Sequence, residues 1–270
     1  SSGCSPDELN EIFNQCNFMC FDPDSRSFTP KEKNISISPF GLFSSNTKKI
    51  LYLTKWQEAS SVYPPNKKFL DNFLSSDDHI TIKKEKIHLK TLDEVALKKK
   101  FDFLKVDAEG ADLEVIKGGK DSLSECLAIK IEIQFKERNI GSPLFGQINS
   151  YLNSHYYLSS IKPFLWLKTK DHYLNSHPEL VCGDAIFLRS YESFLEIFNK
   201  KDNYNKKSFL YKYISLSVLF GAHDSIVYFL NKNNLGLSKL EEKTVINGIK
   251  KSKKNILLSF SSSFFIVFLF

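Results

Sequence analysis

The sequence predicts an α/β fold in which a mixed sheet is covered by helices. Over the first ~190 residues, strand-like and helix-like segments alternate, which is typical of parallel strands joined by helices. The clearest unit is 101–119, where an apolar strand leads through a short acidic loop and Gly110 into a helix. Towards residue 190, two strand-like segments follow one another without a helix, so we expect an antiparallel pair at the end of the sheet.

The elements before this central unit are set by apolar spacing and by breaks. Apolar residues at helical spacing predict a helix over 7–16, and a strand over 17–21 ends at an Asp-Pro break. Strands over 35–40 and 50–54 flank a turn, so we expect a hairpin there. A stretch rich in Ser, Pro and Asn predicts a loop over 56–78.

The elements around and after the central unit follow the same signals. A short helix over 91–97 precedes the unit, and a strand over 126–135 and a helix around 145–152 follow it. Strands over 157–167 and 181–188 are separated by a polar loop and form the expected antiparallel pair.

The character of the chain changes after Arg189. Residues 208–230 are apolar at helical spacing, and 221–230 is faintly similar to the helix pair of an ankyrin repeat. Because one repeat cannot bury its own apolar face, we expect a helical appendage packed on the main domain. The predicted division is an α/β domain over 1–190 and a helical extension over 191–270.

The chain ends in a phenylalanine-rich run that follows the lysines of 250–254. Three serines interrupt this run, and it is shorter than the ~20 residues of a membrane-spanning helix. One prediction for the tail is a docking strand or helix, or a poorly ordered end. The other is peripheral contact with a membrane, because a basic stretch followed by phenylalanines can lie in a membrane interface.

Charge, cysteines and histidines exclude several classes of protein. The net charge of +6 comes from scattered lysines, and the chain has no segment that gathers arginines and aromatics, so we expect no nucleic-acid partner. The five cysteines form no C-x-x-C pair, which indicates reduced thiols of a cytoplasmic protein. The histidines show no metal-ligand spacing, so we predict no metal.

The acidic loop and its helix carry a resemblance to a known family. Residues 107–118, Asp-Ala-Glu-Gly-Ala-Asp-Leu-Glu-Val-Ile-Lys-Gly, resemble the D-x-E-G-x-E-x-x-x-x-x-G signature of FkbM-type methyltransferases, with Asp112 where that family usually has Glu. Further blocks resemble those of the family in the same order: 21–24, 60–63, 91–94, 131–134 and 183–187. The resemblance covers roughly residues 2–189. It implies a Rossmann-like class I methyltransferase sheet, mostly parallel, with an antiparallel hairpin at its end.

The resemblance also implies S-adenosyl-L-methionine as methyl donor, and it points to residues that would bind it. Gly3 matches the glycine of the family's first block, but the strand that should lead into it is missing, so we expect the domain to be truncated there or this motif to be degraded. Asp22 is the candidate to accept hydrogen bonds from both ribose hydroxyls, or else a turn carboxylate before Pro23. Ser38, at the end of the next strand, is a candidate near the adenine.

The candidate catalytic residues are Asp107, Glu109 and Glu132. By resemblance Asp107 lies close to the methyl donor, where it could stabilise the sulfonium or receive the acceptor's proton. Glu109 could orient Asp107 or contact the acceptor, and either acid could instead cap the following helix. Glu132 is an acid inside an apolar strand, which is costly unless it is paired, so it serves the site or pairs with Lys105 or Lys130.

The resemblance implies a methyltransferase that uses S-adenosyl-L-methionine and methylates a hydroxyl of a sugar, a glycan or another small metabolite. One alternative is a different nucleotide-binding Rossmann enzyme, which would need G-x-G-x-x-G near its start, where residues 1–10 contain one glycine. The other alternative is a non-catalytic methyltransferase-like module, in keeping with the incomplete first motif.

Overall fold

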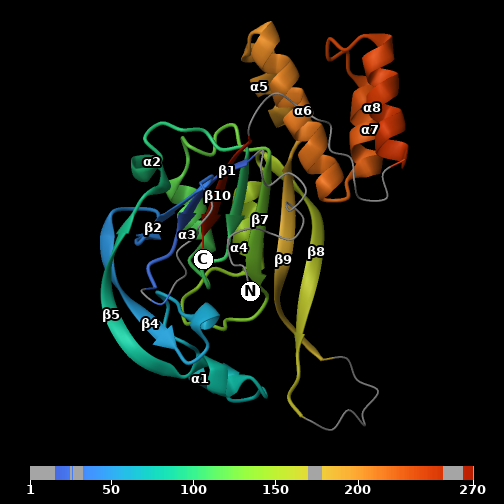
Figure 1. Ribbon diagram of the computed structural model, residues 1–270. Helices are drawn as coiled ribbons and strands as arrows, with labels where there is room; N and C mark the ends of the chain where they lie inside the picture. Colours follow the sequence, from blue (N-terminus) through green and yellow to red (C-terminus); the bar gives the residue numbers. More distant parts are fainter. Residues whose placement is uncertain (1–15, 25, 27–32, 170–177, 252–263, 270) are drawn as a thin grey trace.

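The computed structural model describes the chain outside these stretches: residues 1–15, 25, 27–32, 170–177, 252–263 and 270 (Figure 1). The described residues form a seven-stranded sheet, a three-stranded sheet and eight α-helices, so the predicted α/β class is confirmed. Gly3 and nearly all of the helix expected over 7–16 lie outside the described residues.

The larger sheet has the strand order β2-β1-β10-β6-β7-β9-β8. Its strands are β1 (Cys16–Phe21), β2 (Ile35–Ser38), β6 (Phe103–Val106), β7 (Ala128–Gln134), β8 (Tyr156–Trp166), β9 (Glu179–Arg189) and β10 (Phe264–Leu269). The first five strands in this order are parallel, whereas β9 is antiparallel to both of its neighbours. The antiparallel pair predicted at the end of the sheet is therefore confirmed.

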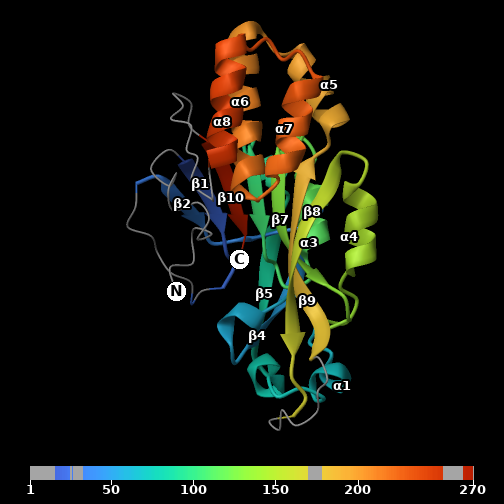
Figure 2. The same ribbon diagram turned by 90° about the vertical axis from the view of Figure 1, so that its right-hand side faces the viewer.

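A strand from the far end of the chain lies in the middle of this sheet. β10 runs parallel to both β1 and β6, with six residue pairs to β1 and four to β6. Figure 2 shows it within the sheet, beside β1. Of the alternatives that the sequence left open for the tail, residues 264–269 therefore form a docked strand.

The smaller sheet corrects the prediction of a hairpin between 35–40 and 50–54. Its strands are β3 (Gly41–Leu42), β5 (Thr81–Lys90) and β4 (Thr47–Thr54), in that order. β4 pairs antiparallel with β5, while β2 pairs with β1 in the large sheet. The sequence did not predict β5, because most of its side chains are polar and only Leu89 is buried, which leaves little apolar alternation.

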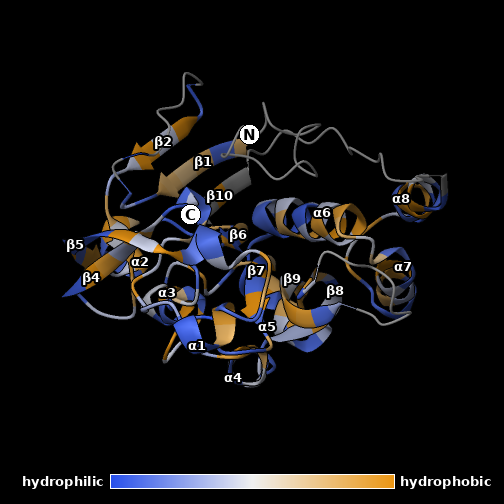
Figure 3. Cartoon of the chain, turned by 90° about the horizontal axis from the view of Figure 1, so that it is seen from below, coloured by the Kyte–Doolittle hydropathy of each residue, from blue (hydrophilic) through white to orange (hydrophobic). Residues whose placement is uncertain are grey.

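Helices cover both faces of the large sheet. They are α1 (Lys67–Leu70), α2 (Leu92–Val95), α3 (Asp112–Gly118), α4 (Phe145–Leu152), α5 (Tyr191–Lys200), α6 (Asn203–Leu219), α7 (His223–Lys232) and α8 (Lys239–Lys251). Figure 3 shows α6 on one side of the strands and α3 and α4 on the other. Among the described residues, no helix combines the length and apolar character needed to cross a membrane.

The helices that follow Arg189 share an apolar core with the sheet. Phe194 stacks on Tyr213, with ring centroids 4.4 Å apart, and both belong to a buried cluster that also contains Phe103 of β6. The Tyr213 hydroxyl donates a hydrogen bond of 2.6 Å to the Arg189 carbonyl. The apolar pattern of 208–230 is accounted for by α6 and α7, whereas the division of the chain at residue 190 stays a prediction.

Helix α3 packs tightly on the segment that leads out of β3. A Cβ added at Gly118 would overlap the carbonyl oxygen of Phe43 and would lie 3.3 Å from the Cα of Ser44. We therefore expect Gly118→Ala to lower the free energy of unfolding by ~1–3 kcal/mol, because backbone must move to admit the methyl group. Urea unfolding measures this cost.

The control for this prediction is Gly146→Ala. Gly146 lies in α4 with nothing within 4 Å of an added Cβ. Alanine there should stabilise the protein by roughly 0.5–1 kcal/mol, since glycine is the poorer helix former. Equal effects of the two substitutions would contradict the close approach at Gly118.

Candidate functional site

The carboxyl ends of the parallel strands meet at one edge of the large sheet and bring the candidate residues together. Asp22 directly follows β1, Ser38 ends β2 and Asp107 directly follows β6. The strand register links Phe21 to Leu269 and Leu269 to Val106, so Asp22 and Asp107 leave the same edge. β10 lies between their strands, and two strand spacings separate them by about 10 Å.

Asp22 shapes the turn that it begins. Its Oδ1 accepts a 2.8 Å hydrogen bond from the backbone N–H of Asp24, and its own N–H donates to the Ser38 carbonyl at 3.2 Å. The predicted turn role is thus realised through one carboxylate oxygen. The same contacts hold Asp22 and Ser38 side by side at the strand ends, and both residues are half-buried.

Arg26 ties this turn to the neighbouring loop. Its single Nε–H is shared between the two oxygens of the buried Asp24 carboxylate, at 2.9 and 3.1 Å. The guanidinium also reaches the Ser60 hydroxyl at 3.0 Å and the Thr54 carbonyl at 3.2 Å. The turn that carries Asp22 is therefore anchored to the end of β4.

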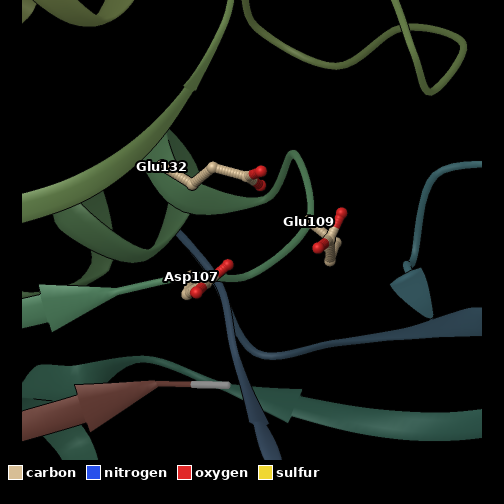
Figure 4. A group of neighbouring side chains, drawn as sticks. All are labelled: Asp107, Glu109 and Glu132. Atoms are coloured by element: carbon tan, nitrogen blue, oxygen red, sulfur yellow. The ribbon is translucent and has the colours of Figure 1, made fainter. Parts of the chain in front are cut away.

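Asp107, Glu109 and Glu132 form a cluster of carboxylates at the same edge (Figure 4). One oxygen from each lies within 4.8 Å of one from each of the others. Asp107 is half-exposed, and Glu109 and Glu132 are buried. The sequence placed Asp107 and Glu109 on the loop after one strand and Glu132 inside another strand, and the structure brings all three close enough to act together.

A buried arginine that the sequence analysis did not select compensates this cluster. Arg138 is 3% exposed and forms ion pairs with Glu109 and with Glu132, the latter at 2.8 Å. Burial raises the pKa of both glutamates, and the positive charge of Arg138 opposes that rise. The lysines considered as partners of Glu132 contact other acids: Lys105 lies 3.1 Å from Asp107, and Lys130 lies 3.5 Å from Asp184.

The composition held a signal for Arg138. The chain has only three arginines among its many lysines. A planar guanidinium is the usual choice for a buried ion pair, because its five donors can satisfy two carboxylates at once. A rare arginine a few residues after the strand that carries a buried acid is therefore a candidate partner for that acid.

The carboxylate cluster also has the donor atoms of a cation site. Carboxylate oxygens suit Mg²⁺ or Ca²⁺, and the three acids lie close enough to share one ion. Arg138 already compensates the charge of two of them. That the site works without a metal stays a prediction.

The loop between β6 and α3 is organised by Asp112, a role that the sequence analysis did not foresee. Its Oδ1 and Oδ2 accept hydrogen bonds from the N–H groups of Ala108 and Gly110, each 3.0 Å long. The N-cap residue of α3 is Ala111, without a side-chain cap, so the helix-capping alternative for Asp107 and Glu109 is not what the structure contains. Asp112 is 2% exposed, and burial, with a smaller contribution from Glu132, raises its pKa to about 7.

The same loop bends sharply to present Glu109 to Arg138. Glu109 and Gly110 have φ angles of +49° and +98°, in the region that favours glycine. The buried Ser61 hydroxyl donates a 2.6 Å hydrogen bond to the Glu109 carbonyl and so holds the bend from outside. The block at 60–63 therefore supports the acidic loop.

Comparison with known proteins places these residues in a family. The methyltransferase FkbM domain model matches residues 20–159, more than half of the chain. No curated protein and no solved structure matches the chain. The matched region contains Asp22, Ser38, the carboxylate cluster and Arg138. The resemblance inferred from the sequence is thus confirmed, and the chain belongs to the FkbM methyltransferase domain family.

Proposed function

We propose that the protein is an S-adenosyl-L-methionine-dependent methyltransferase that methylates a hydroxyl oxygen. The observation that carries the proposal is the convergence of Asp22, Ser38 and Asp107 on one edge of the sheet, within the region matched by a methyltransferase family. In open α/β sheets, ligands bind outside the carboxyl ends of the strands. The two half-exposed acids there suit the ribose and the sulfonium of the methyl donor.

The strand order supports a Rossmann-like class I sheet. On one side of β10 lie β1 and then β2, and on the other side lie β6 and then β7. The order of the strands along the chain therefore runs in opposite directions on the two sides of β10. A crevice forms where the connections diverge in this way, and nucleotides bind in such crevices. Asp22 and Asp107 flank that point.

We assign each residue a role by what it can reach. The Asp22 carboxylate accepts hydrogen bonds from the ribose, and Ser38 lies beside the adenine. S-adenosyl-L-methionine supplies an electrophilic methyl group on a cationic sulfur. Asp107 would stabilise that charge and accept the proton of the acceptor hydroxyl. The bond between the hydroxyl oxygen and the methyl carbon would form as the bond from that carbon to sulfur breaks, with the neutral thioether S-adenosyl-L-homocysteine as the leaving group.

Glu109 and Glu132 act by holding the acidic loop in place, not by contact with the reacting atoms. Both are buried and paired with Arg138, so neither is as accessible to an acceptor as Asp107. Together they keep the acidic loop in the bent form that directs Asp107 to the strand edge. We therefore propose Asp107 as the catalytic residue and the two glutamates as positioning residues.

The acceptor that we propose is a hydroxyl of a sugar, a glycan or another small metabolite, with no nucleic-acid partner. We expect the reaction in the cytoplasm, in keeping with the odd number of cysteines and the absence of a C-x-x-C pair. Residues 264–269 lie in the sheet, so they are not the part of the tail that would contact a membrane.

Titration calorimetry with S-adenosyl-L-methionine tests the proposal. We expect the full chain to bind it and Asp22→Asn to bind it about 10- to 100-fold more weakly, because a hydrogen bond to a charged group contributes about 1.5–3 kcal/mol. Asp71→Asn, which removes an exposed carboxylate paired with Lys67, is the matched control and should bind as the wild type does.

Two other outcomes would overturn the proposal. Binding of a nicotinamide dinucleotide in place of S-adenosyl-L-methionine would favour a different Rossmann enzyme. Binding of neither ligand by the folded protein would favour a non-catalytic module.

A further inference from the structure

The centre of the proposed cofactor edge is built by a strand that does not belong to the matched family region. β10 covers residues 264–269, whereas the match ends at residue 159. Its last residue, Leu269, pairs with Phe21 on one side and with Val106 on the other. These two residues directly precede Asp22 and Asp107, so the end of β10 lies between the two acids of the proposed site.

The neighbouring strands need β10 to satisfy their backbones. β1 and β6 each offer it a full ladder edge, and no other described strand pairs with those edges. An unpaired backbone donor or acceptor in a buried sheet costs free energy comparable to a lost hydrogen bond. Ile266 is 0% exposed and belongs to the same apolar cluster as Phe18 of β1 and Phe103 of β6. Backbone pairing and side-chain burial therefore both hold β10 in the sheet.

We propose that β10, donated by the same chain, is a structural part of the cofactor site, and that S-adenosyl-L-methionine binds only when this strand is in place. The spacing between Asp22 and Asp107 depends on it, because without β10 their strands have no common neighbour in the described sheet. The backbone at Phe268 and Leu269 lies between the ends of β1 and β6, where the cofactor would bind. This inference rests on the proposed function.

Cysteines already present in β1 allow the strand placement to be tested without any ligand. Cys16 pairs with Phe264 and Cys20 with Phe268 in the parallel register. Neighbouring strands are about 4.8 Å apart, within the Cα separation that a disulfide spans. We expect Phe264→Cys to form a disulfide with Cys16 inside one chain. Phe265→Cys, opposite Asn17, is the matched control and should not bond to a β1 cysteine.

The disulfide is best formed during oxidative refolding, because burial raises the pKa of the Cys16 thiol to about 12 and the folded thiol is unreactive. Non-reducing electrophoresis and peptide mapping identify the linked residues. A linkage of position 264 to Cys16 within a monomer supports the proposal. A disulfide-linked dimer would show that a second copy supplies the strand, and no linkage to β1 would overturn the placement.

Two substitutions of buried apolar residues by aspartate test whether cofactor binding depends on β10. Ile266→Asp puts a charge into β10, and Val245→Asp puts one into α8, in the same apolar cluster. We expect Ile266→Asp to weaken binding of S-adenosyl-L-methionine at least tenfold. Val245→Asp should destabilise the fold but keep the affinity within about twofold of the wild type.

The two failures can be told apart. If the wild type does not bind S-adenosyl-L-methionine, the proposed function fails while the disulfide experiment still reports on β10. If the wild type binds it and folded Ile266→Asp protein binds it equally well, the role of β10 in the site is disproved. Circular dichroism establishes that each variant is folded before it is titrated.

Discussion

Arg138→Met is expected to lower the free energy of unfolding by about 3–5 kcal/mol, since it leaves the buried Glu109 and Glu132 without their counter-charge. Methionine fills much of the volume of the arginine side chain. The decrease in the free energy of unfolding therefore measures the loss of charge more than the loss of packing. Urea unfolding at pH 7 measures it. The loss should shrink as the pH falls, because protonation removes the charges that Arg138 compensates.

The control for this prediction is an ion pair of similar geometry at the surface. Lys67 lies 2.6 Å from Asp71 in an exposed i,i+4 pair, and Lys67→Met should cost no more than about 0.5 kcal/mol. The variant that combines Arg138→Met with Glu109→Gln and Glu132→Gln should recover most of the lost stability. If Arg138→Met were as mild as Lys67→Met, the ion pairs of Arg138 would not stabilise the acidic loop.

The second expected result concerns the pH dependence that Asp112 imposes on stability. Its pKa is about 7 in the folded protein and 3.8 in a free side chain, so between these values the folded state holds a proton that the unfolded state has released. The contribution of Asp112 to stability therefore falls as the pH rises from about 4 to 7. The slope due to this group is about 1.4 kcal/mol per pH unit, on the order of 4 kcal/mol over the whole range.

Unfolding of Asp112→Asn at pH 5, 6 and 7 checks this result. The asparagine cannot ionise, so the slope between pH 5 and 7 should be smaller than in the wild type by about 1.4 kcal/mol per unit. Asp71→Asn, which removes an exposed carboxylate, is the control for the loss of one negative charge. A wild-type slope in Asp112→Asn would show that this carboxyl is ionised in the folded protein throughout the range.

The elements that the sequence predicted well are those with strong local signals. The strand–loop–helix unit appears as β6 and α3, because a continuous apolar run and a glycine turn specify each part locally. The acids placed on strand ends also come together, because parallel strands end at the same edge. Local pattern was therefore enough to predict which acids lie together at this edge of the sheet.

The features that escaped prediction depend on distant partners. In the sequence, β10 is an apolar segment near the end of the chain. Its own residues do not indicate that β1 and β6 each have an edge with which it can pair. Arg138 reads as one basic residue in a polar loop, and its role follows only when Glu109 and Glu132 are close in space. Asp112 is similar, since its two backbone donors lie in a turn whose shape the side chain itself creates.

The place of β10 also has a consequence for how the polypeptide folds. The parallel pairs that join it to β1 link residues from nearly opposite ends of the described chain. Such contacts raise the contact order, and forming them requires the closure of a very long loop, which slows folding. During synthesis, β1 and β6 leave the ribosome well before β10. Until β10 is made, the strand edges with which it pairs are unpaired and can associate with other chains.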